Sequence, residues 1–262
     1  MDAGTIDVGL GTDHVKELTK LKKPIIAIEE LIWNGLDADA TKVEVILRRN
    51  GLDGLDTIEV LDDGEGIDAS QKNDTFGWLG ESPKRTKTMT PSGRAVHGRK
   101  GEGRFRALGL GATVQWDTCC VGPDGKPLEW GMSANIAAIK KFKYGAIKCA
   151  RGGKRGTSVT VTNLYDTLGS LLTPNAPIEL TQRLALYLQR YTGISVTYDG
   201  QRLNPDVLKS DERLYDLVGT MPDGSTATAK LTVIEWRREQ ERRLYLCTSE
   251  GFPRAEQPAL SR

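Results

Sequence analysis

Residues 29–45 read EELIWNGLDADATKVEV and place polar residues at regular intervals in a helical pattern. Helical periodicity spans residues 24–38, and the apolar side chains fall on one side of this helix, at Ile28, Leu31, Ile32 and Leu36. At ~100° per residue, Glu30, Asn34 and Asp37 fall within roughly 60° of one another on the opposite side. The sequence therefore predicts one polar stripe along the helix.

The simplest interpretation of this stripe is the solvated face of an amphipathic helix. The residue types argue against it, because Asn34, Gly35, Asp37 and Asp39 are poor helix formers. A face that is only solvated is better served by Lys, Glu, Gln or Arg. We therefore expect that something other than contact with solvent determines these positions.

Composition limits the class of protein. The chain has 262 residues, a formal net charge of +1 and four cysteines. This length allows one large domain, or one domain with an appendage, and the charge argues against a general polyanion binder. No segment reads as a signal peptide or a membrane span, and the cysteine spacing fits neither a zinc site nor a disulfide framework. We expect a cytoplasmic protein without membrane contact.

The chain alternates helical and extended patterns. Periodicity predicts helices over residues 14–22, 24–38, 103–110 and about 174–193. It predicts strands over 42–49, 57–63, 112–121, 127–136 and 156–164, a hairpin over 194–203, and a last hairpin followed by a tail over 230–262. Residues 73–103 are rich in Gly, Ser, Thr and basic residues and have weak periodicity, which is typical of a functional lid.

A second segment, VLDDGEGID at residues 60–68, follows a strand pattern with aspartates and glycines. The strand delivers Asp62 and then breaks at Gly64 and Gly66, where the absent side chains allow a ligand to approach the backbone. Alternation along the strand points Asp63 away from Asp62. Taken alone, this pattern also fits an ordinary turn at the end of a strand.

A third segment, HGRKGEGRFRALGLG at residues 97–111, places three glycines before an expected helix, at Gly98, Gly101 and Gly103. Backbone amides and a positive helix end could hold phosphate oxygens here, with charge from Arg99 and Lys100. The spacing is not that of a Walker loop and is a poor dinucleotide-binding fingerprint, and no kinase residue set follows.

A fourth segment, RGGKRGTSVTVTNL at residues 151–164, opens a strand with a Gly-Thr pair. Taken in order, the four segments resemble the motifs of the GHKL superfamily of ATPases, which includes gyrase B, the ninety-kilodalton heat-shock chaperone, histidine kinases, MutL and MORC proteins. The resemblance covers about residues 5–165. It matches Glu30-x-x-x-Asn34-x-x-Asp37-Ala38, Asp62-x-Gly64-x-Gly66, Gly98-x-x-Gly101-x-Gly103 and Gly156-Thr157.

The resemblance implies a Bergerat fold, an α/β two-layer sandwich in which ATP lies between helices and a mixed, mainly antiparallel sheet. Asp62 would accept a hydrogen bond from the adenine amino group, and Thr157 would support it. Asn34 would coordinate Mg²⁺ on the triphosphate. Glu30 would act as the general base toward water, and Asp37 would order the adenine end.

The resemblance also assigns the glycine-rich segments. Gly64 and Gly66 would shape the floor of the site, and amides around Gly101 and Gly103 would hold phosphates with help from Lys100. Residues 73–103 would be the ATP lid. Its basic residues fit either a solvated loop or a phosphate or nucleic-acid contact; they are Lys84, Arg85, Lys87, Arg94, Arg99 and Lys100.

The remaining expectations concern one tryptophan, the two histidines and the branch of the GHKL superfamily. Trp33 is expected to pack rather than to stack on a base. His14 and His97 read as ordinary surface or loop residues, and neither lies in a dimerisation helix of the kind that histidine kinases need. The sequence of the third segment most resembles that of bacterial MORC-like and heat-shock-chaperone-like ATPases. Some of these are linked to DNA manipulation or antiviral defence against phage.

The predicted organisation is an ATP-binding domain over residues 1–172 and the start of a transducer-like domain over 173–262, as the N-terminal part of a longer protein. The predicted function is slow, Mg²⁺-dependent ATP hydrolysis that closes the lid and an ATP-dependent homodimer, with a DNA or protein client bound by other domains. A module that senses nucleotide or binds nucleic acid without useful turnover is the alternative.

Overall fold

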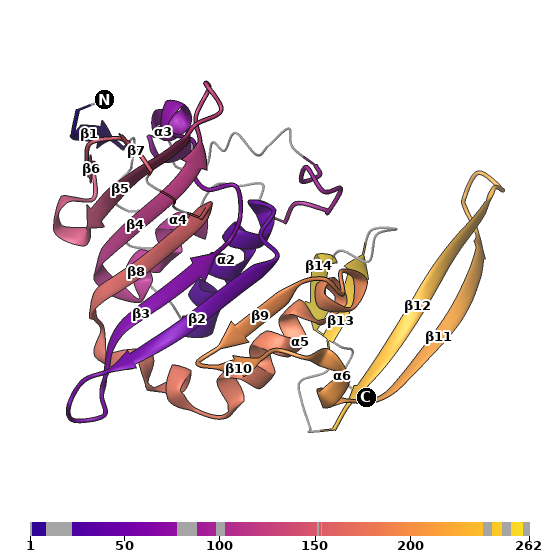
Figure 1. Cartoon of the computed structure of the whole chain (residues 1–262). Helices are drawn as coiled ribbons and strands as arrows, with labels where there is room; N and C mark the ends of the chain where they lie inside the picture. Colours follow the sequence, from indigo (N-terminus) through magenta and orange to yellow (C-terminus); the bar gives the residue numbers. More distant parts are fainter. Residues whose placement is uncertain are drawn as a thin grey trace.

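The computed structural model describes residues 2–8, 23–77, 88–97, 103–150, 152, 154–237, 243–247 and 253–258. Most of them form one ten-stranded sheet with helices on one face (Figure 1). Its order is β1 (Gly4–Asp7), β6 (Lys141–Tyr144), β5 (Pro127–Asn135), β4 (Gly111–Val121), β8 (Gly156–Leu164), β3 (Leu55–Asp62), β2 (Lys42–Arg49), β9 (Ser195–Tyr198) and β10 (Gln201–Arg202), and β7 (Lys148–Cys149) pairs with β5.

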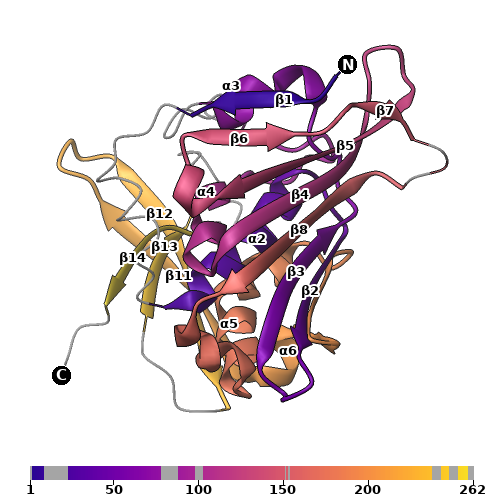
Figure 2. The same cartoon turned by 90° about the vertical axis from the view of Figure 1, so that its left-hand side faces the viewer.

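The sheet is mixed and mainly antiparallel. Among the described strand pairs, β2 and β9 run parallel and the others run antiparallel. The helical segments are η1 (Ala69–Gln71), α3 (Lys72–Phe76), η4 (Ile136–Ala138), α2 (Pro24–Asp37), α4 (Gly103–Arg106), η3 (Ala107–Gly109), η5 (Asp166–Leu172), α5 (Asn175–Arg190) and α6 (Pro205–Leu208). Figures 1 and 2 place α2 and α5 on the same face of the sheet, which confirms the predicted two-layer α/β class.

Helix α2 begins and ends as its sequence dictates. Pro24 stands at the first helical position, where its fixed φ and missing N–H cost nothing. The helix ends in a Schellman motif, in which the N–H of Ala40 donates to the carbonyl of Gly35 and the N–H of Asp39 to that of Leu36, both at 3.1 Å. Asp39 occupies the left-handed position of this motif with a φ of 66°, a place that usually holds glycine.

The core lies between the sheet and the helical layer. On β2 and β3 the buried side chains alternate with exposed or half-buried ones, as in Val43, Val45 and Leu47 and in Ile58 and Val60. The helical face contributes fully buried residues such as Ile28, Ile32 and Leu36. Burial of these side chains supplies most of the driving force that holds α2 on the strands.

The sheet extends beyond the domain boundary expected at residue 172. Strand β9 pairs with β2 from Lys42 opposite Ser195 to Val45 opposite Tyr198, so it belongs to the same ladder as the first strands. Helix α5 contributes Leu180 and Leu184, which are 0% exposed, to the same core. The expected division at 172/173 therefore does not coincide with a break in the structure, because residues 175–202 complete the sheet and its cover.

The C-terminal segments pair differently from the expected hairpin. Strand β12 (Thr226–Trp236) pairs backward with β11 (Lys209–Thr220), and β13 (Arg243–Cys247) pairs with β14 (Pro253–Pro258). The prediction that residues 230–236 would pair with the segment after them was therefore wrong. Figure 1 shows the β11–β12 hairpin extending away from the sheet, and most of its side chains are exposed.

Two other predictions concern residues outside this description. The helix expected over 14–22 lies among residues 9–22, and 15 of the 31 residues of the expected lid, 78–87 and 98–102, lie outside the description as well. Strands β1, β6 and β7 were not predicted, because they are short and carry little alternation. Within the described ranges, no helix is long and apolar enough to cross a membrane.

Candidate functional site

The polar stripe of α2 faces protein and not only solvent. Asp37 is 4% exposed, and Glu30 and Asn34 are half-buried. The helix also buries Trp33 and Gly35, so apolar or small residues occupy most of its circumference. The solvated-face interpretation is therefore wrong, and each polar residue of the stripe has a distinct environment.

Glu30 lies next to a cation of α4, the short helix that begins at the last glycine of the third motif. The Nε atom of Arg106 is 3.7 Å from Oε1 of Glu30, and the two side chains are 31% and 27% exposed. Arg106 is the last residue of α4, which begins at Gly103, so it follows directly from the segment expected to hold phosphates. This ion pair joins the expected base to that segment.

Asn34 lies one turn farther along α2, on the same stripe. Within the described part of the chain, its side-chain amide makes no hydrogen bond, although the residue is half-buried. A half-buried amide oxygen that is not used by the protein can serve as a ligand for a hard cation. The described residues hold no cluster of three or more His, Cys, Asp or Glu side chains suited to a metal, so an ion here would need further oxygens from its substrate or water.

Asp37 has a structural contact that its expected role did not include. Its Oδ1 accepts a hydrogen bond of 2.7 Å from the backbone N–H of His97, the residue directly before Gly98 of the third motif. The ring of His97 stacks on Trp33, with centroids 4.3 Å apart and an interplanar angle of 10°, and Tyr187 packs edge-on against Trp33 at 5.0 Å. The prediction that Trp33 packs is confirmed, while His97 is an anchored residue that the sequence did not reveal.

Asp62 at the end of β3 has a fixed carboxylate. Its Oδ1 accepts hydrogen bonds from the backbone N–H of Gly64 at 2.9 Å and from that of Thr157 at 3.3 Å. A Cβ on Gly35 would lie 2.8 Å from the Cβ of Asp62, so the glycine allows α2 to contact this residue directly. Two backbone donors and one helix face therefore hold the orientation of this acid.

Thr157 lies in a row of three polar residues across neighbouring strands. It is opposite Asp62 on β3 and opposite Thr118 on β4, so the three side chains share one face of the sheet. The hydroxyls of Thr118 and Thr157 are 3.2 Å apart, and the two residues are 6% and 9% exposed. Thr118 was not among the predicted site residues, and only the register of β4 on β8 identifies it.

The glycines of the second and fourth motifs allow close contacts within the chain. A Cβ on Gly64 would lie 2.5 Å from the carbonyl oxygen of Ala38, and one on Gly66 would lie 2.3 Å from that of Cys119. Gly156 has a φ of 140°, and a Cβ there would lie 2.0 Å from the carbonyl oxygen of Asp62. Backbone packing around Asp62 thus accounts for these glycines.

Asp63 points away from this row, as alternation predicted. Its Oδ1 accepts from the N–H groups of Thr41 and Lys42, both at 2.7 Å, and its Oδ2 accepts from the Thr41 hydroxyl at 2.8 Å. Burial raises the pKa of Asp63, but the hydrogen bonds from Lys42 and Thr41 outweigh it and leave the pKa below its ordinary value. This carboxylate fixes the start of β2.

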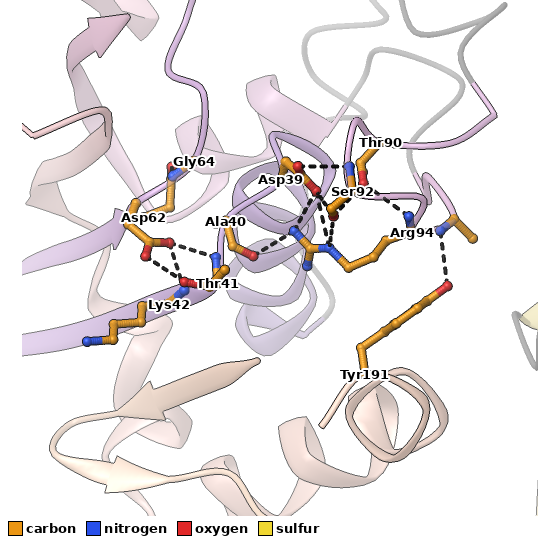
Figure 3. Close-up of polar contacts among 12 residues, drawn as sticks. Asp39, Ala40, Thr41, Lys42, Asp62, Gly64, Thr90, Ser92, Arg94 and Tyr191 are labelled. Atoms are coloured by element: carbon orange, nitrogen blue, oxygen red, sulfur yellow. Dashed lines mark hydrogen bonds and ion pairs between the residues drawn. The ribbon is translucent and has the colours of Figure 1, made fainter. Parts of the chain in front are cut away.

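Residues 88–97, in the C-terminal part of the expected lid, are fixed by an ion pair that Figure 3 shows in close-up. The Nη2 atom of Arg94 is 2.9 Å from Oδ1 of Asp39, and it also donates to the carbonyl oxygen of Ala40 at 2.8 Å. Ser92 donates through its N–H and its hydroxyl to the same carboxylate. We refer to Asp39, Ser92 and Arg94 as the Asp39 clamp.

The Asp39 clamp is nearly excluded from solvent, and this determines its ionisation. The side chains of Arg94 and Asp39 are 8% and 16% exposed. Burial opposes ionisation of Asp39, but hydrogen bonds from Ser92, Thr90 and Arg94 and the charge of Arg94 outweigh burial and lower its pKa to about 2. Arg94 is therefore neither a solvated lid residue nor available to phosphate, contrary to both predictions for the basic lid.

Helix α5 adds two hydrogen bonds next to the Asp39 clamp. Tyr187 accepts a hydrogen bond of 3.2 Å from Nη1 of Arg94, and Tyr191 accepts one of 3.2 Å from the backbone N–H of Ala95. Figure 3 shows Tyr191 pointing from the helix toward this segment. Burial raises the pKa of Tyr187 to about 12, so its hydroxyl is neutral at physiological pH.

The structure thus brings together residues of three of the four motifs. Glu30, Asn34 and Asp37 lie on one helix, and the Asp62 and Thr157 row packs on it through Gly35. Lys100 and Gly101 lie outside the described residues, and Gly103 is described only as the first residue of α4. Their predicted phosphate contacts stay predictions.

Comparison with known proteins relates this arrangement to a family of ATPases. Residues 23–139 match the family described as histidine kinase-, DNA gyrase B- and HSP90-like ATPase. The putative type II restriction enzyme HgiDII of Herpetosiphon aurantiacus is 33% identical over 54% of this chain and 23% of its own length. The mismatch repair protein pms1 of Schizosaccharomyces pombe is 28% identical over 64% and 20%. MutL of Pediococcus pentosaceus is 27% identical over 58% and 21%. The chain thus spans less than a quarter of the length of these relatives.

Proposed function

Residues 23–139 form an ATP-binding domain of the GHKL superfamily of ATPases, and from this premise we propose that the chain binds ATP with Mg²⁺ and hydrolyses the nucleotide slowly. The observation that carries the proposal is the oriented carboxylate of Asp62. Two backbone N–H groups hold one of its oxygens, and its Cβ packs on Gly35 of the helix that carries Glu30 and Asn34. The acid assigned to adenine therefore packs against the same helix that carries the polar residues assigned to the phosphates.

The residues present fit ATP and Mg²⁺. Asp62 offers an acceptor to the amino group of adenine, and guanine has a carbonyl oxygen at that position. Asn34 offers a single amide oxygen, which suits Mg²⁺ because this ion usually takes few protein ligands together with phosphate oxygens and water. Bound Mg²⁺ would neutralise charge on the triphosphate.

Glu30 is the residue that we assign as general base. Its carboxylate would accept a proton from the attacking water, and Asn34, one turn farther along α2, would hold Mg²⁺. Arg106, at 3.7 Å from Glu30, would orient the carboxylate. Lys100 and the amides around Gly101 and Gly103 would complete the phosphate site. Gly64 and Gly66 would shape the floor of the ATP site. Asp37, which accepts from the N–H of His97, would hold the chain directly before the third motif.

We assign residues 73–103 as the ATP lid, with its C-terminal part fixed by the Asp39 clamp. Lid closure on ATP would support an ATP-dependent homodimer, and segments after residue 208 would form a transducer-like part. Two relatives are described as DNA mismatch repair proteins and one as a restriction enzyme. A DNA-processing or phage-defence role in the cytoplasm, of MORC-like type, is the setting that we propose.

Calorimetric titration with Mg²⁺ and a non-hydrolysable ATP analogue tests the proposal. We expect the wild type to bind and Asp62→Asn to lose on the order of 100-fold in affinity. The reason is that Gly64 and Thr157 donate to the amide oxygen, which leaves an NH₂ group facing the adenine amino group. Asp56→Asn, an exposed change on the same strand, is the control and should bind normally. Absence of binding by the wild type would refute the proposal.

A second measurement separates hydrolysis from nucleotide sensing. Glu30→Gln should abolish phosphate release while retaining affinity for the ATP analogue, because it removes only the proton acceptor. Phosphate release at the wild-type rate by Glu30→Gln would remove Glu30 from its role. A wild type that binds ATP but releases no phosphate would favour the alternative of a sensing module without turnover.

A further inference from the structure

The hydroxyl of Thr118 has three polar neighbours in the buried row behind Asp62. It accepts from the backbone N–H of Ile67 at 2.9 Å and donates to the carbonyl oxygen of Gly156 at 3.0 Å. Its oxygen lies 3.2 Å from the hydroxyl oxygen of Thr157. Water cannot easily replace any of these partners, because Thr118 is only 6% exposed.

Counting protons fixes the direction of each of these hydrogen bonds. A hydroxyl has one proton, a carbonyl oxygen can only accept, and a backbone N–H can only donate. The single proton of Thr118 therefore goes to Gly156, and one of its lone pairs receives the N–H of Ile67. The contact between the two hydroxyls is then favourable in one direction, with Thr157 donating its proton to Thr118.

The consequence concerns what Thr157 can offer to a ligand. With its proton committed to Thr118, the Thr157 oxygen can only accept, and so can the ionised carboxylate of Asp62 in the adjacent position of the row. The side chains of this row thus offer acceptors to a bound base. A ligand edge that carries N–H donors matches them, whereas a carbonyl oxygen would face lone pairs.

We propose that Thr118 is a specificity-determining residue that selects a 6-aminopurine over a 6-oxopurine by fixing the direction of the Thr157 hydroxyl. Thr118 acts through Thr157, and it has no contact with the nucleotide in this assignment. The inference rests on the proposed ATP site and names the group within it that discriminates against the oxo base. If the Thr118 hydroxyl is removed, the proton of Thr157 is released and Thr157 can donate to a carbonyl oxygen.

The test compares ADP with IDP, which differ in the base alone, each titrated calorimetrically with Mg²⁺. We expect the wild type to prefer ADP by about 10- to 100-fold, the range for a site whose buried acceptors lose their donors. In Thr118→Val this ratio should fall to about threefold, and the absolute affinity for IDP should rise. Thr118→Ser retains the hydroxyl and should retain the preference for ADP.

The rise in IDP affinity is the decisive result, because a partly misfolded protein cannot bind a ligand more tightly than the intact one. Thr118→Ala supplies a second proton-free variant in case valine is not tolerated. A preference for ADP that is unchanged in both variants would overturn the role of Thr118 and leave the proposed ATP site intact. A wild type that binds neither nucleotide would overturn both.

Discussion

Gly35 is a glycine inside a helix where alanine would normally be the better helix former by about 1 kcal/mol. Its Cα faces β3, and an added Cβ would lie 2.8 Å from the Cβ of Asp62 and 3.3 Å from Cγ2 of Val43. Neither neighbour can retreat easily, because Asp62 is held by two backbone donors and Val43 is 1% exposed. The position therefore favours close packing over helix propensity.

We predict that Gly35→Ala destabilises the fold by about 1–3 kcal/mol, the usual cost of overpacking, and weakens ATP binding by displacing Asp62. Urea unfolding and calorimetric titration would measure the two effects. Gly169→Ala is the matched control, because Gly169 lies in η5 with open space around the position of a Cβ. Equal stability of Gly35→Ala and the wild type would contradict the packing argument.

The sequence revealed some of these residues and not others, for physical reasons. The positions of Asp62 and Asp63 followed from strand alternation, which is a local property, and the structure agrees with it for Asp63. The partner of Arg94 could not be inferred, because Asp39 is 55 positions away along the chain. Thr118 was hidden for the same reason, since only the strand register places it beside Thr157.

At the scale of elements, the end of α2 is stabilised by a charged residue in a place that usually takes glycine. Asp39 adopts a φ of 66°, and its carboxylate binds Ser92 and Arg94 within the expected lid. The strain of the left-handed conformation is offset by these contacts. The Asp39 clamp thus joins a helix terminus to the segment before the third motif.

The Asp39 clamp predicts a specific dependence of stability on pH. The folded-state pKa of Asp39, about 2, lies below the ordinary value of 3.8, so its contribution is present above pH 4 and is lost as the pH falls toward 2. The shift corresponds to about 2 kcal/mol. Asp39→Asn tolerates the same backbone conformation and removes the charge. Urea unfolding at several pH values should show the two proteins converging below pH 4, and a constant difference would contradict this assignment.

A second element-scale prediction concerns the contact between α2 and α4. Replacing Arg106 by Gln removes the cation beside Glu30, and we expect the turnover of ATP to fall roughly threefold to tenfold with little change in nucleotide affinity, the scale of a partly exposed ion pair. Arg106→Lys should recover part of the rate. Steady-state phosphate release and calorimetry would separate the two quantities.

The matched control for that experiment removes a different cation that contacts the same helix, α2. Arg183 on α5 lies 3.0 Å from Glu29, the neighbour of Glu30, so Arg183→Gln also removes a cation from α2. Its effect should be on stability and not on turnover, because Glu29 is not assigned to the reaction. A loss of turnover equal to that of Arg106→Gln would indicate that general loosening of α2 explains both variants.

On the scale of the whole molecule, the local patterns predicted the strands but not their partners. Strands β2 and β8 have the predicted bounds, since each combines alternation with clear turn residues. The parallel contact of β9 with β2 joins segments about 150 residues apart, as the hydrogen bond between Leu47 and Asp199 illustrates. No local pattern carries that information, which is why the sequence did not place residues 195–198 in the same sheet as residues 42–49.

We predict from this topology that a chain ending at residue 208 folds and binds ATP, whereas a chain ending at residue 172 does not fold. The shorter chain would lose β9 from the ladder and would expose the core under α5, where Leu180 and Leu184 are 0% exposed. Circular dichroism, thermal melting and nucleotide titration of the two chains would compare them. A folded and active chain of 172 residues would show that α5 and β9 are accessory.

The direct succession of β10, α6 and β11 has a mechanical consequence. Two residues separate the end of β10 at Arg202 from the start of α6 at Pro205, and β11 begins at Lys209, immediately after α6 ends at Leu208. The hairpin is therefore attached by a short connection to the ladder that contains β2 and β3. We expect that a rotation of this ladder near Asp62 would displace the tip of the hairpin farther than its base, because β11 and β12 extend over 12 and 11 residues.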